Sequence, residues 1–248
     1  MEPMLGKRAT EGAVARPSAA GRRPGPWSKV FDYRRRTRSP MNSRPAQRSP
    51  YRSRLRAEQA AATRRIVQDA ATRLFVERGY GGTSIDAIAE EAGVGRSTVF
   101  AAAGGKAWLL KTAYDRAIVG DDEQVSFAER PEVLKLSAMR DPAEIVTAYA
   151  HLLSDAEQRV SAIYEVVRSA AGIDPEVHEL WTEIGRQRLA GAKRIATLLR
   201  SKGGLRKGLS VESARDIIWI YNDPAVHHAL VGVRRWRQTN FATGSPTR

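Results

Sequence analysis

The stretch IAEEAGVGRSTVFAAAGGK, residues 88–106, joins two short helical patterns through a single glycine. The apolar positions of the first pattern end at Ala92, and Gly93 predicts a tight turn. The second pattern places Val99 on the inner side and leaves residues 95–98, Gly-Arg-Ser-Thr, on the outer side. This arrangement is typical of a helix-turn-helix, although the same spacing also fits a corner of an ordinary helical protein.

The outward residues have the chemistry of a helix tip that reads DNA. Small polar side chains at this tip allow the backbone to approach base edges in the major groove. Arg96 can donate two hydrogen bonds to guanine O6 and N7, and Ser97 and Thr98 can contact bases or phosphates. We therefore interpret residues 95–98 as candidate DNA contacts.

The composition fits a helical protein with a sizeable core. The chain has 248 residues, of which 42% are hydrophobic, and no alternating strand pattern of useful length follows Leu55. It has no cysteine, which excludes disulfides and cysteine-ligated metal sites. No apolar run approaches the ~18 residues of a membrane span. We expect an all-α chain with about nine helices after residue 55.

Helix starts are marked by capping residues. The pairs Asp141-Pro142, Asp174-Pro175 and Asp223-Pro224 each combine an N-capping carboxylate with proline at the first helical position, where a missing N–H is not needed. Ser210 is a fourth candidate cap. Thr83 is a fifth, in a variant of the capping box.

Positive charge is concentrated at the N-terminus. The formal net charge of the chain is +14. Residues 1–55 contain 12 Arg and 2 Lys against three acidic residues, a net charge of +11, and the remaining residues carry +3. This segment is rich in Pro, Gly, Ser and Arg and lacks apolar periodicity, so we expect a disordered basic arm. Such an arm raises affinity for nucleic acid without reading its sequence.

Two other origins of this arm stay open. Its composition also resembles an organelle transit peptide, and translation from Met41 would remove most of it. No apolar stretch follows Arg22-Arg23, which excludes a twin-arginine signal.

Residues 63–110 closely resemble the DNA-binding domain of the tetracycline-repressor (TetR) family of bacterial regulators. The matching motifs occur in order: Ile66, Ala70, Leu74-Phe75 and Gly79-Tyr80; Thr83-Ser84-Ile85, Ile88-Ala89 and Ala92-Gly93-Val94; Thr98-Val99-Phe100; and Lys106, Leu109 and Leu110. The resemblance implies an N-terminal three-helix DNA-binding domain followed by a helical regulatory domain. The later motifs Trp181, Ser210, Ala214, Pro224, Leu230-Val231 and Arg235-Trp236 look like that second domain.

The resemblance implies roles for individual residues. Thr83, at the amino end of the second helix, would contact a phosphate through its hydroxyl and its backbone N–H, and Lys106 would add a charged phosphate contact. The region from Arg96 to Thr98 would face bases, and each half of a homodimer would read one half of a palindromic operator in double-stranded DNA. The expected DNA-binding residues are Thr83, Ser84, Gly95, Arg96, Ser97, Thr98, Phe100 and Lys106.

The chain departs from the family pattern after Val99. Relatives usually carry a tyrosine at the position of Phe100, whose hydroxyl contacts a phosphate, and an aromatic doublet where this chain has Ala102 and Ala103. Each missing hydrogen bond weakens binding by about 1 kcal/mol, which the basic arm can offset. Relatives also usually carry a further helix after the position of Trp236.

The resemblance also implies a dimer and an effector pocket. In this family the last two long helices of each subunit, here Ser210–Asn222 and Pro224–Arg237, form a four-helix bundle with their counterparts. The expected interface residues, which could otherwise close the monomer core, are Ile217, Ile218, Leu230 and Val233. Five aromatic residues on helical stripes either fill the core or line a largely apolar pocket for an unidentified small molecule: Tyr149, Tyr164, Trp181, Trp219 and Tyr221.

These observations predict a sequence-specific DNA-binding transcriptional regulator, a ligand-responsive repressor that acts as a homodimer. The alternative is a nucleic-acid-coating or architectural protein driven by the basic arm. The sequence contains no metal-ligand cluster, phosphate-binding glycine loop or catalytic dyad, so we expect no enzyme, no cofactor and no metal. The expected location is the cytoplasm, with no membrane partner. The expected domains are the arm at 1–55, the helix-turn-helix domain at 56–105, the regulatory domain at 106–240 and a disordered tail at 241–248.

Overall fold

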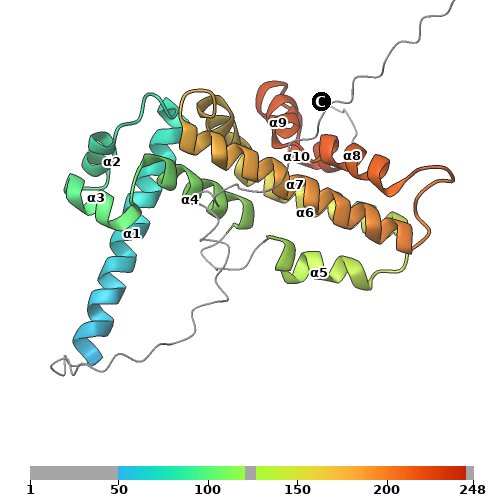
Figure 1. Cartoon of the computed structure of the whole chain (residues 1–248), viewed down its shortest axis with the longest axis horizontal. Coiled ribbons are helices and arrows are strands. Elements are labelled where there is room, and N and C mark those ends of the chain that lie inside the picture. The colour runs from blue at the N-terminus through green and yellow to red at the C-terminus, as the bar shows by residue number, and fades with distance from the viewer. Residues whose placement is uncertain (1–49, 121–126, 244–248) are drawn as a thin grey trace, which may run out of the picture. The chain divides into compact units, whose positions relative to one another are not determined.

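The computed structural model describes residues 50–120 and 127–243 (Figure 1). These residues form ten α-helices, a short 3₁₀ turn and a π-helical segment, and they contain no β-strand, which confirms the expected all-α fold. The elements are α1 (Pro50–Arg78), α2 (Ile85–Glu91), α3 (Arg96–Ala103), α4 (Lys106–Val119), η1 (Phe127–Glu129), α5 (Pro131–Ala138), α6 (Pro142–Ala170), α7 (Pro175–Ser201), α8 (Val211–Tyr221), α9 (Pro224–His227), η2 (His228–Val233) and α10 (Gln238–Thr243). The expected arm up to residue 49 and the end of the tail, 244–248, lie outside the described residues.

Helix α1 begins earlier than the sequence analysis expects. It starts at Pro50 and crosses the domain boundary placed at residue 55. Proline is well tolerated in a first helical turn, and the residues that follow it up to position 66 contain no glycine or further proline and are rich in Ala and Arg. Residues 50–55 are therefore helical and do not belong to a disordered arm.

The first three helices pack as a small bundle. Val67 and Phe75 on α1, Ile88 on α2 and Val99 on α3 are buried in one hydrophobic cluster. Gly93 has a φ of 65°, a left-handed conformation that side chains other than glycine adopt with strain, so the turn between α2 and α3 depends on this glycine. Short helices such as α2 and α3 are held by this packing more than by intrinsic propensity.

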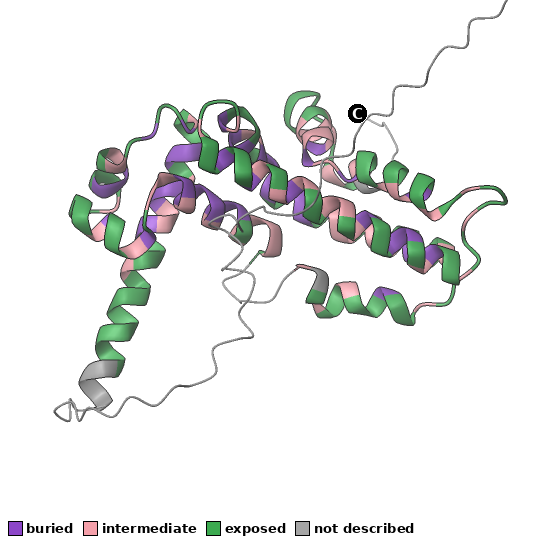
Figure 2. Cartoon of the chain, viewed as in Figure 1, coloured by how far each residue is buried: buried purple, intermediate pink, exposed green. Residues whose placement is uncertain are grey.

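Helices α4, α6 and α7 continue the same core. Helix α4 packs between α1 and α6, and the cluster extends through Tyr114 of α4 to Tyr164 and Val167 of α6 and Leu180 of α7. A second, smaller cluster is centred on Leu136, Ile145, Ile195 and Leu199, at the opposite end of α6 and α7. Figure 2 shows the buried residues following α6 and α7 along their inner faces. The first three helices and the helices that follow them thus share one hydrophobic core.

The capping residues fall mostly where the sequence places them. Asp141, Asp174 and Asp223 each accept a hydrogen bond from a backbone N–H in the first turn of α6, α7 and α9. Ser210 does the same at α8. Each of these helices except α8 then carries proline in its first turn, as expected.

The C-terminal segment differs from the expected single helix over 224–237. Helix α9 has four residues and passes into η2, and the positive φ of 61° at Arg235 ends the helical run before Arg237. Helix α10 then begins at Gln238. The amide Nε2 of Gln238 donates to the carbonyl oxygen of Ser154 at 2.8 Å and to its hydroxyl at 2.7 Å. These bonds attach α10 to α6, and they also make residues 241–243 helical, where a disordered tail was expected.

Candidate DNA-binding surface and regulatory core

The N-terminal turn of α3 is exposed. Gly95 is the N-cap residue and provides no side-chain cap, so the first backbone N–H groups of α3 have no side-chain acceptor at this position. Arg96 and Ser97 are exposed, Thr98 is half-buried, and Val99 behind them is buried. An uncapped helix N-terminus attracts anionic groups such as phosphates. The tip that the sequence identified is therefore accessible to an outside partner.

Arg96 is held across the turn by α2. Its Nη1 lies 2.7 Å and 2.5 Å from the two carboxylate oxygens of Asp86, and its guanidinium lies 5.6 Å from the ring centroid of Phe100. Both charged side chains are more than half exposed, so the ion pair contributes only about 0–1 kcal/mol. Arg96 can therefore exchange Asp86 for a base edge at small cost.

Thr83 does not have the role that the family pattern implies. Its side chain is only 1% exposed, and its hydroxyl lies 2.8 Å from the carbonyl oxygen of Gly79 and 3.0 Å from that of Leu74. Its backbone N–H donates to the carbonyl oxygen of Tyr80. Both groups are satisfied within the domain, so Thr83 is a structural residue that closes the α1–α2 turn.

Ser84 caps α2 in place of Thr83. Its Oγ accepts a hydrogen bond from the backbone N–H of Ala87 at 3.0 Å, and the residue is exposed. The sequence alone does not show which of the adjacent hydroxyls caps α2, because packing decides which of the two side chains faces the core. Ser84 stays a candidate phosphate contact next to the amino end of α2.

The turn between α3 and α4 contains the small residues at which this sequence departs from the family pattern. Phe100 is 42% exposed, whereas Ala103 is buried and packs against the core of the first bundle. Gly104 has a φ of 71° and ends α3, and Gly105 is the N-cap residue of α4. The small residues thus let α4 approach α3 closely, and Phe100 is the exposed aromatic residue at this end of α3.

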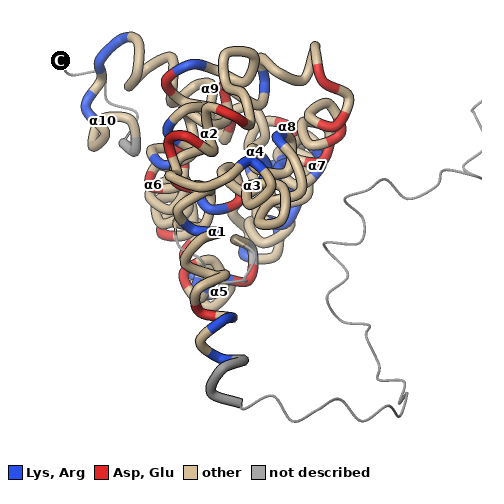
Figure 3. Tube along the Cα trace, turned by 90° about the vertical axis from the view of Figure 1, so that its left-hand side faces the viewer, with Lys and Arg blue, Asp and Glu red and all other residues tan. Residues whose placement is uncertain are grey.

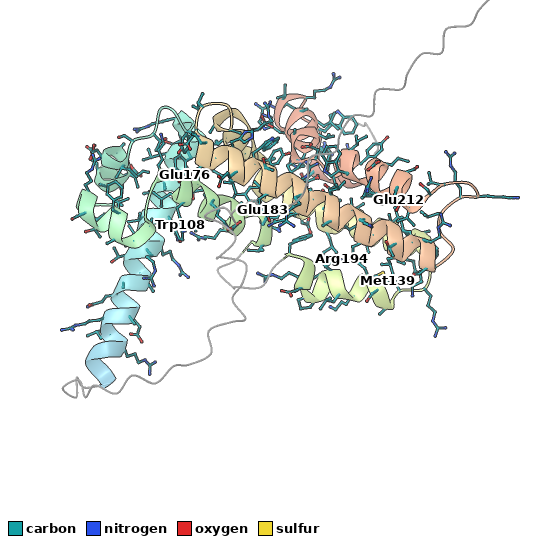
Figure 4. All side chains as sticks on the ribbon, in the orientation of Figure 1. Trp108, Met139, Glu176, Glu183, Arg194 and Glu212 are labelled. Atoms are coloured by element: carbon teal, nitrogen blue, oxygen red, sulfur yellow. The ribbon has the colours of Figure 1, made fainter. Side chains whose placement is uncertain are left out.

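Tyr80 joins the end of α1 to the start of α7. Its hydroxyl donates to Asp174 Oδ2 at 2.6 Å, and Asp174 is also the N-cap of α7. The Lys106 ammonium lies 4.0 Å from the centroid of the Tyr80 ring. Figure 4 places Glu176 at the end of α7 that meets the first bundle. The sequence motif contains Tyr80 but does not predict this contact, because its partner lies 94 positions away in the chain.

The pKa values at this junction reflect its packing. Burial raises the pKa of Tyr80, and the hydrogen bond to Asp174 raises it further. Partial burial alone would raise the pKa of Asp174, but the bond from Tyr80 and the N–H bonds from the first turn of α7 outweigh it and lower that pKa. Desolvation lowers the pKa of Lys106, which Asp174 partly opposes. Lys106, the expected phosphate contact, is half-buried and lies against Tyr80.

Comparison with known proteins agrees with this geometry. Residues 67–113 match the family model described as bacterial regulatory proteins, tetR family. This range runs from the first buried residue of α1 through α2 and α3 into α4. The chain is therefore similar to the TetR family over these residues. None of the curated proteins matches it in sequence.

Solved structures share the fold of this chain at low identity. FadR from Bacillus subtilis, solved with stearoyl-CoA, is 20% identical with a TM-score of 0.56, covering 72% of this chain and 93% of FadR. NalD, the secondary repressor of the MexAB-OprM multidrug efflux pump in Pseudomonas aeruginosa, is 19% identical with a TM-score of 0.55, covering 75% and 93%. A protein from Saccharomonospora viridis in complex with choline is 18% identical with a TM-score of 0.55, covering 74% and 93%.

The five aromatic residues expected around an effector pocket do not share one environment. Tyr164 is buried, and its ring lies 5.1 Å from that of half-buried Trp181. The hydroxyl of Tyr149 accepts a hydrogen bond from the Asn222 side chain at 3.1 Å. Tyr221, in contrast, is 74% exposed, so it cannot line an internal pocket.

Arg188 is a residue that sequence reasoning missed. Its guanidinium lies 3.1 Å from the Tyr164 hydroxyl, 3.0 Å from the carbonyl oxygen of Trp219 and 3.1 Å from Asp223 Oδ2. It therefore ties α7 to α6, α8 and the cap of α9. Arg188 ends the polar run Arg186-Gln187-Arg188. This position gives no signal in the sequence, because an inward arginine is recognised only when its partners are known.

Glu157 is a second missed residue. This residue of α6 is only 3% exposed, and its Oε1 has no hydrogen-bond partner among the described residues. Burial raises its pKa to about 8; the charge of Arg188 opposes this shift and that of Asp223 adds to it. A buried acid that keeps its proton near neutral pH is an unusual feature of a helical core.

The expected dimer residues divide between surface and core. Ile217 and Val233 are exposed, Leu230 is half-buried, and Ile218 packs inward against the smaller hydrophobic cluster. Ile218 thus stabilises the monomer. A groove of about 320 Å³ separates α7 from α8 on the same side; its lining residues are Gly185, Leu189, Arg215, Asp216, Trp219 and Ile220. Trp219, expected in the internal pocket, lines this outer groove.

Metal ligands and membrane spans are both absent from residues 50–120 and 127–243. Neither range contains a group of three or more His, Asp or Glu residues that could hold a metal ion. None of the helices in these ranges combines the length and the apolarity that crossing a membrane requires.

Proposed function

We propose that the chain is a ligand-responsive transcriptional repressor that binds a palindromic operator as a homodimer. The observation that carries this proposal is the exposed N-terminal turn of α3, with Arg96 and Ser97 accessible and Val99 anchored in the core behind them. Residues 95–98 face bases, Ser84 contacts a phosphate, and Lys106 reaches one after releasing Tyr80. Helices α1 to α3 form the DNA-binding domain, and α4 to α10 form the regulatory domain.

The dimer is supported by the outer face of α8. Ile217, Ile220 and Tyr221 are exposed there, and a chain of this length rarely leaves several large apolar side chains on one helix unless they meet a partner. A second copy contributes the same face by two-fold symmetry, which matches two recognition helices to two half-sites about 34 Å apart.

The effector is supported by the regulatory core. FadR and the Saccharomonospora viridis protein share this fold and were solved with stearoyl-CoA and with choline. In this chain the Oε1 of buried Glu157 has no hydrogen-bond partner among the described residues, and its carboxyl group interacts electrostatically with Arg188. A ligand that prefers one state of this core shifts DNA affinity through a coupling of about 1–3 kcal/mol.

Selection of duplexes from a random pool, followed by salt titration, tests the proposal. The dissociation constant of the full chain is measured on the enriched duplex and on a random duplex of equal length. We expect the enriched duplex to bind at least about 10³-fold more tightly at ~0.15 M salt, and to contain an inverted repeat. A ratio near one would eliminate the repressor.

The alternative function is non-specific coating of nucleic acid. The observation that favours it is the net charge of +11 in residues 1–55 against +3 in the rest. Under this alternative the same titration gives equal constants for both duplexes, with a steep salt dependence on each.

A further inference from the structure

The N-terminal half of α1 projects from the bundle without tertiary packing. Residues 54–66 are exposed except for half-buried Thr63, and the first fully buried residue of the helix is Val67. Figure 2 shows the described part of this half as exposed apart from one half-buried position, and Figure 1 shows it extending away from the other helices. In Figure 3 only its first described turns are seen beyond the other helices. From Arg54 to Val67 it measures about 20 Å. It also precedes the range shared with the family, which begins at residue 67.

This half of α1 cannot be explained by burial of apolar surface. A helix buries little when it is polar on every side, and an isolated helix of this length is only marginally stable in water. Its residues have high intrinsic propensity, including three consecutive alanines at 60–62. The sequence therefore specifies a helix that the rest of the fold does not use.

Its arginines are divided between two faces. Arg56 lies eleven residues before Val67, which is about three helical turns, and Arg64 lies three residues before it. Both arginines therefore continue the side of α1 that packs on α2, α3 and α4. Among the described residues neither has an ion-pair partner. Arg54 and Arg65 lie on the opposite side, where Arg54 Nε is 2.9 Å from Glu58 Oε1.

We propose that the face of α1 carrying Arg56 and Arg64 is a second DNA-binding surface, which contacts phosphates beside the segment read by α3. Charge complementarity selects this partner, since the face carries two unpaired cations and no acid, and duplex DNA presents a regular row of phosphates. The two arginines are about 12 Å apart along the helix, so they reach separate phosphates. The surface is continuous with the bundle that holds α3. This inference rests on the proposed DNA-binding function.

Paired variants of the full chain test this surface. Arg56→Gln with Arg64→Gln removes the proposed contacts, and Arg54→Gln with Arg65→Gln removes the same charge from the opposite face of the same helix. Glutamine retains helix propensity, and circular dichroism of each variant checks that α1 stays helical. The measurement is the slope of log K against log salt on the enriched duplex and on a random one.

We expect the first variant to lower the slope by about 1.8 on both duplexes, at about 0.9 for each phosphate that the protein no longer neutralises. The ratio of the wild-type binding constant to that of this variant then decreases about 12-fold between ~50 and ~200 mM salt. The second variant should keep a slope close to that of the wild type. Equal slopes for the wild type and the first variant, or equal decreases in both variants, would overturn this inference. A wild type that does not distinguish the two duplexes would instead refute the repressor proposal and leave the α1 surface to be judged on the random duplex.

Discussion

At the scale of single residues, Arg96 is restrained by a carboxylate that DNA has to displace. We expect Arg96→Ala to weaken operator binding by about 1–3 kcal/mol and to relax base preference at one position in each half-site. Asp86→Asn should have the opposite sign and strengthen binding by up to about 1 kcal/mol, because it frees Arg96 and removes a negative charge near the phosphates. Dissociation constants on the operator and on single-base variants measure both effects. If Asp86→Asn weakens binding, Asp86 orients Arg96 rather than competing for it.

Glu157 gives the regulatory core a dependence on pH. Burial raises its pKa in the folded chain to about 8 from an ordinary value of 4.5. Between these values the folded state holds a proton that the unfolded state has released. The contribution of Glu157 to the free energy of unfolding is therefore full below about pH 4.5 and is lost as pH rises through about 8. The free energy of unfolding should therefore fall with rising pH by up to about 1.4 kcal/mol per unit.

Urea unfolding of the wild type and of Glu157→Gln at pH 5, 6, 7 and 8 measures this contribution. Glutamine cannot titrate, so the difference in unfolding free energy between the two proteins should change steadily across this range. Parallel pH profiles would show that the Glu157 carboxylate is charged in the folded chain and paired by a neighbour such as Arg188.

At the scale of elements, the sequence predicts those features that residues close together in the chain determine. The Asp-Pro starts of α6, α7 and α9 are readable because a cap and a proline act within one turn. The choice between Thr83 and Ser84 is not readable, because it depends on which hydroxyl meets the carbonyl oxygens of Leu74 and Gly79. Helix α10 was missed for the same reason: Gln238 attaches it to a residue 84 positions earlier.

The candidate site shows the same difference between features set by local sequence and features set by distant contacts. The α3 tip was found because Gly93 and the apolar spacing around it are local signals. Arg188 and Glu157 were missed because a buried ionisable residue is recognised by its surroundings, which lie on other helices. The wrong placement of Tyr221 has a simple cause: an aromatic residue on a helical stripe fits the core and an interface equally well.

Helix α8 provides the test of the dimer. Ile220 is 58% exposed and borders the groove between α7 and α8. We expect Ile220→Lys to produce monomers at micromolar concentration in sedimentation velocity, because a buried charge at a two-fold interface is repeated in both copies. Ile173→Lys is the matched control, since Ile173 is exposed in the turn between α6 and α7. Dimers that persist in Ile220→Lys would place the interface elsewhere.

At the scale of the whole molecule, the first helical bundle and the start of α7 meet at Tyr80. Its hydroxyl bonds the residue that caps α7, so a change at the start of α7 alters the end of α1 directly. Tyr80→Phe removes this bond and leaves the ring in place against Lys106. Because Asp174 is partly exposed, we expect the junction to be destabilised by about 1 kcal/mol, which corresponds to about fivefold faster hydrogen exchange.

Peptide-level hydrogen exchange tests whether the turn at residues 79–84 and the first turn of α7 are stabilised together or independently. In Tyr80→Phe the decrease in protection should appear together in the turn at residues 79–84 and in the first turn of α7, where the Asp174 carboxylate accepts from the N–H groups of Glu176 and Val177. Tyr221→Phe should leave both segments unchanged, since Tyr221 is remote from the junction and exposed. If only residues 79–84 become less protected, the cap of α7 is independent of Tyr80, and a signal from the regulatory core has to reach α3 through the packing of α4 between α1 and α6.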